Sequence, residues 1–245
     1  MNQKFIDRPF VVPALIIGAF FVVAMGLLGS NIANRGSDST IVVTGSVISD
    51  VRSDKVTWQI GVQRTAYVGG TSFAYEAVSR DANIVKAYFE DQKLASSSIT
   101  ASVISTDENY KQNQNDPTTF IVRETLTIQT TDVDKIDQLS RGLGVVTAKI
   151  SPDTRLVPYQ PEYYISALPG LRVSLLSQAI KDARARAVSI ASSGSTKVGA
   201  LKSASSGVVQ VLAPNSTNVE DYGSYDTSTI QKQVMVSIRA TFYVK

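Results

Sequence analysis

The sequence predicts an α+β fold of mainly antiparallel sheets with packed helices, preceded by one N-terminal transmembrane helix. Three observations predict it. Residues 10–29 are an uncharged apolar run, the apolar residues after position 40 alternate between strand-like and helix-like periods, and the expected strands come in pairs between helices. Paired neighbouring strands favour antiparallel sheets with helices packed on one face.

The first element is a predicted membrane anchor at residues 10–30, after a short cytoplasmic segment at residues 1–9. At a rise of about 1.5 Å per residue, about twenty helical residues cross the hydrocarbon core of a bilayer. Lys4 and Arg8 precede the apolar run, so we expect a single-pass protein of the inner cell membrane with its C-terminal domain periplasmic or extracellular. A cleaved signal peptide is the alternative, although its apolar region is normally shorter and ends at a small-x-small site.

Small residues recur every four positions along one ridge of this segment, interrupted by Val22: Ala14, Gly18, Gly26 and Ser30. Small residues at this spacing let membrane helices approach closely, and the ridge is therefore a candidate helix-packing surface. The alternative is that Gly and Ala are simply frequent in membrane helices. Residues 31–40, "NIANRGSDST", are polar and small, and we interpret them as a linker to one extracytoplasmic domain at residues 41–245.

The domain is predicted to contain pairs of strands separated by helices. In chain order the expected elements are strands at 40–49 and 55–68, a helix at about 71–92, strands at 99–107 and 118–130, a helix capped by Thr130 or Thr131, strands at 144–151 and 154–160, a helix at 167–192, and strands at 198–212 and 229–244. The polar segment "DENYKQNQNDPTT" between two of the strands predicts an exposed hairpin loop.

Two of the helices show apolar faces at helical spacing. The helix at 71–92 has the stripe Phe73, Ala77, Ile84, Val85, Tyr88 and Phe89, and the helix at 167–192 has the stripe Ala179, Ala183, Ala187 and Ala191, flanked by Leu176, Ile180 and Ile190. A flat alanine face packs closely on a sheet. Lys181, Arg184 and Arg186 lie on other faces of the second helix, where charges are usually solvated, so we interpret this helix as structural rather than as a binding element.

The composition excludes several classes of function. The chain has no histidine and no cysteine, which removes Ser-His and Cys-His catalytic pairs and the usual zinc sites. A net charge of +3 is too small to indicate nucleic-acid binding, and no Gly-rich phosphate loop occurs. We therefore expect no enzyme activity, no cofactor and no metal. An enzyme that uses only Asp, Glu, Lys, Tyr and Ser stays open, but no acidic pair marks it.

Two segments are candidate functional sites. "PYQPEYYISALPG" contains Tyr159, Tyr163 and Tyr164, and tyrosines are favoured at protein interfaces because the ring is buried while the hydroxyl stays hydrated. They are a candidate oligomer interface, with the alternative that they fix a loop to their own domain. The polar segment 214–229 carries Glu220, Asp221 and Asp226, which can in principle hold a hard cation but are more often just solvated.

Four segments resemble the SIMPL-domain family of bacterial envelope proteins: "IVVTGSVIS", "LLSQAIKDARARAVSIA", "VGALKSASSGVVQV" and "YDTSTIQKQVMVSIRATFYV". The similarity extends over about residues 40–245 and rests on structural motifs. The resemblance implies an exported or membrane-anchored protein, a link to envelope or oxidative stress, and assembly into a ring-like or channel-shaped oligomer. The family supplies no catalytic motif to transfer to this chain.

Two hypotheses for the function follow. The first is a non-enzymatic, membrane-anchored extracytoplasmic domain that assembles with copies of itself into a ring-like homo-oligomer. Its expected partners are its own copies and the membrane, and the sequence does not identify other protein partners. The second is a monomeric ligand-binding or chaperone-like envelope module, for which we expect an apolar pocket.

Overall fold

The structure, a computed structural model, describes residues 17–25, 39–111, 113, 115–216 and 222–245. Within that part the named strands are β1 (Thr40–Arg52), β2 (Lys55–Tyr67), β3 (Ile99–Ala101), β4 (Ser105–Glu108), β5 (Thr119–Thr130), β6 (Thr154–Pro158), β7 (Glu162–Tyr164), β8 (Val198–Leu212) and β9 (Gln231–Val244). The helices are α2 (Thr71–Asp91), the 3-10 turn η1 (Ser96–Ser98), α3 (Val133–Ser140), α4 (Gly144–Thr147) and α5 (Leu168–Ser193).

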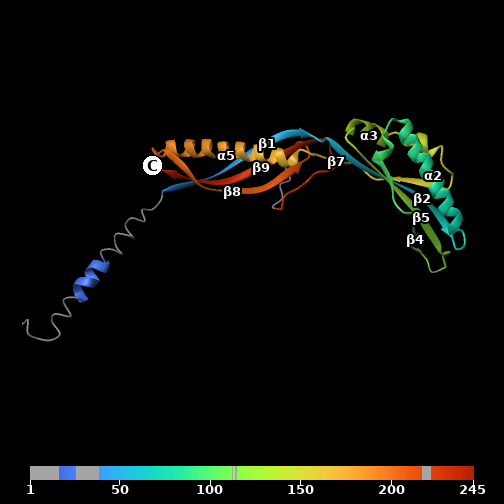
Figure 1. The fold of residues 1–245 in the computed structure, drawn as a ribbon, viewed down its shortest axis with the longest axis horizontal. Coiled ribbons are helices and arrows are strands. Elements are labelled where there is room, and N and C mark those ends of the chain that lie inside the picture. Colours follow the sequence, from blue (N-terminus) through green and yellow to red (C-terminus); the bar gives the residue numbers. More distant parts are fainter. Residues whose placement is uncertain (1–16, 26–38, 112, 114, 217–221) are drawn as a thin grey trace, which may run out of the picture. The chain divides into compact units, whose positions relative to one another are not determined.

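These elements form the predicted α+β fold (Figure 1). One sheet has three strands in the order β1-β9-β8, and the other has six strands with the main path β3-β5-β2-β6, to which β4 and β7 add. The chain divides into two compact units, one with residues 46–182 and 206–238, the other with residues 183–205, 239–245 and the N-terminal part up to residue 45.

The core of the six-stranded sheet includes one face of β2, formed by alternate residues of the strand. Val56, Trp58, Ile60 and Val62 are all fully buried. Strand β2 pairs antiparallel with β5 from Val56 opposite Thr130 to Tyr67 opposite Thr119. Helix α2 contacts both strands. It buries much of its predicted stripe, although Phe73 is 62% exposed and the guanidinium of Arg64 lies over its ring.

The predicted strand at 99–107 is two short strands, β3 and β4, which both pair antiparallel with β5. The interruption has a local cause at Ser102. Its N–H donates to the Thr125 carbonyl, but the Thr125 N–H donates to the Ser102 hydroxyl instead of to a backbone carbonyl. The Ser102 hydroxyl therefore replaces a backbone carbonyl as the acceptor at this point of the strand pair, and serine side chains commonly compete with the backbone in this way. The hairpin between β4 and β5 is confirmed.

The segment after β5 differs from the sequence-based prediction in two places. Asp132, rather than Thr130 or Thr131, caps α3, because its carboxylate accepts the Lys135 N–H. The predicted strand at 144–151 is wrong: this segment contains the single-turn helix α4. Strands need neighbours, and here the N–H groups of Val146 and Thr147 donate to the Leu143 carbonyl, so that the β propensity of two valines is overridden.

Helix α5 lies along the three-stranded sheet, to which it is joined by hydrogen bonds with β1 and β8 (Figure 1). The alanine stripe is confirmed, since Ala179, Ala183 and Ala187 are fully buried and Ala191 nearly so. The flanking prediction is partly wrong. Leu175 is buried, whereas Ile190 is 55% exposed, because it lies outside the arc that the small residues define.

Arg184 of α5 is exposed, as expected, but it also contacts the sheet. Its guanidinium donates to the Gly199 carbonyl of β8 at 3.2 Å and lies 5.8 Å from the ring centroid of Phe242 on β9. The helix therefore contacts the sheet through a charged side chain beside its alanine face.

The described N-terminal residues, 17–25, are helical and exposed. Among the described residues, no helix is long and apolar enough to cross a bilayer, so the structure does not support the predicted transmembrane helix. Most of the predicted packing ridge, namely Ala14, Gly26 and Ser30, lies outside the described residues, as does the rest of the predicted anchor. Gly18 is described, and a Cβ atom there would meet nothing within 4 Å.

Candidate functional site

The predicted tyrosine cluster divides into one core residue and two surface residues. Tyr163, on β7 opposite Val56 of β2, is 4% exposed and belongs to the hydrophobic core of its own domain. Tyr159 is 48% exposed, and its carbonyl accepts the Trp58 indole N–H at 2.9 Å. Tyr163 is thus placed where the alternative interpretation expects it, which leaves Tyr159 and Tyr164 as the candidates for an intermolecular contact.

Tyr164 is half-buried and held by its own domain. Its hydroxyl donates to a carboxylate oxygen of Glu162 at 2.7 Å, and this hydrogen bond raises the pKa of the Tyr164 phenol. Its ring lies 6.0 Å from the ring of Tyr225, whose hydroxyl accepts the Ile165 N–H. The segment around β7 is therefore fixed in position, and any interface that uses it is preorganised.

A polar cavity of about 520 Å³ lies next to Tyr163. It is lined by Asp137 and Arg141 of α3, whose side chains form an ion pair at 2.9 Å, and by residues at the start of β9. Burial raises the pKa of the Tyr163 phenol, and the neighbouring Asp137 carboxylate raises it further. The phenol is thus kept neutral, and the lining charges are already paired with each other.

In the acidic segment before β9, Asp226 binds a lysine of the same chain. The side chain of Lys232 is fully buried, and its ammonium donates to the Asp226 carbonyl at 2.5 Å and to the Asp226 carboxylate at 3.1 Å. Burial lowers the pKa of Lys232, an effect that the contact with Asp226 opposes. The predicted neighbours Glu220 and Asp221 lie outside the described residues.

The same carboxylate is surrounded by hydrogen-bond donors. Ser228 and Thr229 donate to it through both their backbone N–H groups and their hydroxyls. Burial favours the neutral acid, but these hydrogen bonds and the lysine outweigh burial and hold the pKa of Asp226 well below its usual range. No group of three metal-ligating side chains occurs in the described part of the chain, and both carboxylate oxygens of Asp226 accept hydrogen bonds from the protein.

Asp81 is a buried carboxylate that the sequence interpretation missed. It lies on the inner side of α2 and is fully buried. Its two oxygens accept hydrogen bonds from the Ser151 hydroxyl at 3.1 Å and the Thr154 hydroxyl at 2.5 Å, and Arg80 lies 3.6 Å away. A polar residue within an apolar helical stripe is the signal that could have revealed it. The arrangement fixes the segment before β6 to α2, and both oxygens of the acid are occupied.

Glu124 is the second acidic group that was missed. It lies on the same face of β5 as the buried Val122 and Leu126, and one of its carboxylate oxygens has no hydrogen-bond partner. Burial raises the pKa of Glu124. A single carboxyl group without a second acid or a base next to it has no partner for acid-base chemistry.

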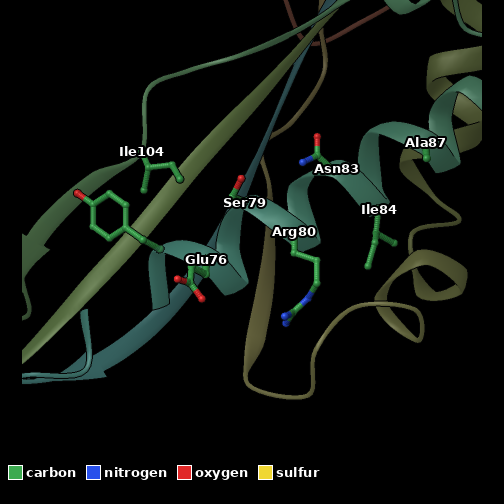
Figure 2. A pocket seen from close by; sticks show the side chains of 8 residues that line it. Glu76, Ser79, Arg80, Asn83, Ile84, Ala87 and Ile104 are labelled. Carbon is green, nitrogen blue, oxygen red and sulfur yellow. The ribbon is translucent and has the colours of Figure 1, made fainter. Parts of the chain in front are cut away.

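A shallow apolar groove of about 860 Å³ runs along the outer side of α2. Figure 2 shows its lining, in which Ile84 and Ala87 come from α2 and Ile104 comes from the connection between β3 and β4. Arg80 and Glu76 add charges of opposite sign. Arg80 is already bonded to Ser151, at 2.8 Å. The groove combines apolar contact area with the polar side chains of Glu76, Ser79 and Asn83.

Strand β8 presents a long uncovered stretch that the sequence interpretation treated only as a strand. Nine successive residues, 200–208, are exposed, so that side chains on both faces of the strand reach solvent. The strand ends the sheet, because β9 is its only neighbour in the sheet order of the described chain. Beyond the exposed stretch, Tyr225 forms a bridge with Val211, and the last three residues of β8 are buried. Only 200–208 therefore remain open.

These features define the class of protein: an α+β protein with antiparallel sheets, in which the buried charged groups Asp81, Asp226 and Lys232 are bonded within the chain. The family follows from the comparison with known sequences. Residues 41–242 match SIMPL, described as a protein of unknown function (DUF541), and this chain belongs to that family. None of the curated proteins matches the chain significantly.

Proposed function

We propose that this protein is a non-enzymatic domain that associates with copies of itself at a membrane surface. The observation that carries the proposal is the open stretch of β8. A strand edge presents unpaired N–H and C=O groups, and natural proteins usually protect such an edge unless it meets a partner. Here nine successive residues are exposed without a covering element among the described residues.

The proposed tether is the N-terminal apolar segment. Its described residues expose large apolar side chains, among them Phe20 at 78% and Val22 at 73%. Such side chains favour an apolar environment, and lipid supplies one. The proposed orientation has the N-terminus in the cytoplasm and residues 41–245 in the periplasm or outside the cell. Tethering raises the effective concentration of neighbouring domains, so that a modest contact between them is sufficient for association.

The proposed assembly is a closed, ring-like homo-oligomer, because identical chains usually form closed symmetric assemblies. A ring requires a second contact in addition to the β8 edge if that edge pairs with itself. Tyr159 and Tyr164 are the candidates, since both are solvent-accessible and held in place. A role in envelope or oxidative stress is part of the proposal only through the family resemblance.

The test is the mass of the full-length protein after extraction into detergent, measured by light scattering coupled to size-exclusion chromatography. The proposal expects a multimer with a defined maximum mass, which dissociates into smaller species only on dilution. A monomer at all concentrations overturns it. Orientation is checked separately with protease added to intact spheroplasts: digestion of the C-terminal domain is expected, and a protected Lys245 contradicts the proposed topology.

A second candidate function, a monomeric ligand-binding or chaperone-like module, is favoured by the groove along α2 (Figure 2). Ala87 is exposed in that groove, so Ala87→Arg fills it without disturbing the core. An apolar fluorescent dye that binds the wild type and not this variant supports the module. Equal dye binding by both proteins, with a defined multimer in scattering, favours assembly instead.

A further inference from the structure

The structure assigns the open edge of β8 to a second copy of the same strand, paired antiparallel across a two-fold axis near Ala204. This inference deepens the proposed self-association and rests on it. It specifies which edge is used, which strand occupies it and in which register. Strand addition at a free edge is a recurring mode of protein recognition, in which backbone hydrogen bonds supply much of the affinity.

The other sheet edges carry features that hinder pairing. On β1, the Ser46 N–H donates at 2.9 Å to the carboxylate of Asp182 on α5, so a side chain occupies this backbone group. In the six-stranded sheet the outer strands are short: β3 has three residues and β4 has four. Short length and charge are the usual protections of an edge, and β4 ends in Asp107 and Glu108.

The β6 edge is protected in the same way. This strand has five residues and ends at Pro158, which has no N–H to donate. By contrast, β8 has fifteen residues and contains no proline. Within its open stretch the one charged residue is Lys202. The β3, β4 and β6 edges are therefore short or protected. On β8, side chains occupy two backbone carbonyls, those of Gly199 and Gly207, but its length and its lack of proline suit it to pairing.

The side chains of the open stretch fit a copy of themselves. Most are small: Ala200, Ser203, Ala204, Ser205, Ser206 and Gly207. Small side chains allow two strands to approach without steric conflict on either face. On the opposite edge of β8, a small residue already allows close approach to β9. A Cβ atom on Gly207 would lie only 2.5 Å from the Ser237 hydroxyl of β9.

The charge distribution selects the register. The midpoint of 200–208 is Ala204, and antiparallel pairing about that residue places Lys202 opposite Ser206 of the second copy. Like charges directly opposite one another destabilise a strand pair, and this register avoids them. A register centred on residue 202 would place the two lysines face to face.

Association through β8 also stops at two copies. Two copies joined through β8 form one continuous sheet in the order β1-β9-β8-β8-β9-β1, and both of its outer edges are β1 strands. Asp182 occupies a backbone group on each of these, which hinders a third copy from adding. A two-fold contact of this kind is isologous and does not propagate into a filament.

Single-cysteine scanning tests the inference directly, because the natural chain has no cysteine to interfere. Cysteines are placed one at a time at 200–206 and at 208, and the full-length protein in detergent is oxidised with copper phenanthroline. Residues directly opposite across a strand pair have Cβ atoms about 4.5 to 5.5 Å apart, near the separation that a disulfide requires. We expect the disulfide-linked dimer to peak at Ala204→Cys and to be at least fivefold weaker at residues 200 and 208.

The different results separate the inference from the proposed function. No cross-link along β8 in a protein that scattering shows to be multimeric overturns the inference and leaves self-association in place. A monomer ends both. A maximum at residue 202 contradicts the register, since it brings the two lysines together.

A charge variant gives an independent readout. Ala204→Glu places two carboxylates opposite each other and should weaken the β8 contact at least tenfold, measured as the dissociation constant from dilution series. The matched control is Ser105→Glu, which adds the same charge to an exposed edge residue of β4 and should change nothing. Circular dichroism melts verify that both variants stay folded. Equal association by both variants and the wild type contradicts the assignment of β8.

Discussion

The two sheets of this protein are covered by helices in different ways. The six-stranded sheet meets α2 through large side chains, among which Trp58 and Phe89 are fully buried with ring centroids 5.6 Å apart. The three-stranded sheet meets α5, whose buried face consists of alanines after Leu175. The first arrangement depends on filled volume, and the second depends on close approach of the helix backbone.

The difference has a consequence for the exposed surface. Large side chains on α2 reach across β2 and β5 and bury one face of both strands. Alanine side chains do not extend sideways from α5, and the neighbouring strand β8 keeps nine successive exposed residues. A narrow helix contact thus leaves an uncovered edge strand, which is the surface that the proposed association uses.

The largest expected effect is on the filled core. Trp58→Ala should reduce the free energy of unfolding by about 3 to 5 kcal/mol, because it leaves a cavity beneath α2 and removes the hydrogen bond from the indole to the Tyr159 carbonyl. Urea denaturation followed by circular dichroism measures the change. A loss below about 1 kcal/mol would contradict the interpretation that large side chains filling the core stabilise the contact between this sheet and α2.

The buried carboxylate of α2 should contribute next. Asp81→Ala removes the acceptor of the Ser151 and Thr154 hydroxyls, and we expect a loss of about 1.5 to 3 kcal/mol, the range for hydrogen bonds to a charged group. Asp81→Asn keeps the shape of the side chain and one acceptor oxygen, and it is the matched control with a smaller expected loss. If Asp81→Asn melts like the wild type, charge is not what holds the segment before β6.

The alanine face should respond to added volume instead of lost volume. Ala183→Leu is expected to destabilise the protein by about 1 to 3 kcal/mol through overpacking, because Ala183 is fully buried. Ala185→Leu changes an exposed position of the same helix and serves as the control. Thermal melts of both variants decide the point: equal melting temperatures would mean that α5 is not closely packed at this face.

The smallest expected effect is the acid sensitivity of the Asp226 site. The pKa of Asp226 is lower in the folded protein than in the unfolded chain, so its contribution is complete above about pH 4 and is lost as the pH falls towards the folded value. We expect a loss of about 1 kcal/mol between pH 7 and pH 3 that Asp226→Asn lacks. Parallel slopes for the two proteins in acid denaturation would show that this carboxylate does not titrate as described.

Local sequence patterns predicted most of the elements and their inner faces. Periodicity located β2, α2, α5 and β9 and identified the alanine stripe, because a periodic pattern is a property of consecutive residues. The family was also evident from the sequence, and the match over residues 41–242 confirms it. The absence of histidine and cysteine limits the chemistry whatever the fold, because composition does not depend on conformation.

The partners of the polar groups and the strand edges that stay open follow from contacts between distant segments, which local patterns do not reveal. The strand expected at 144–151 is a helical turn because it has no neighbouring strand, and Tyr163 lies in the core because β7 pairs with β2. Asp81 meets hydroxyls that are about seventy positions away in the chain. The open edge of β8 depends on strand order, which is a relation between distant segments. Local pattern cannot encode such relations, since they arise only when the whole chain is folded.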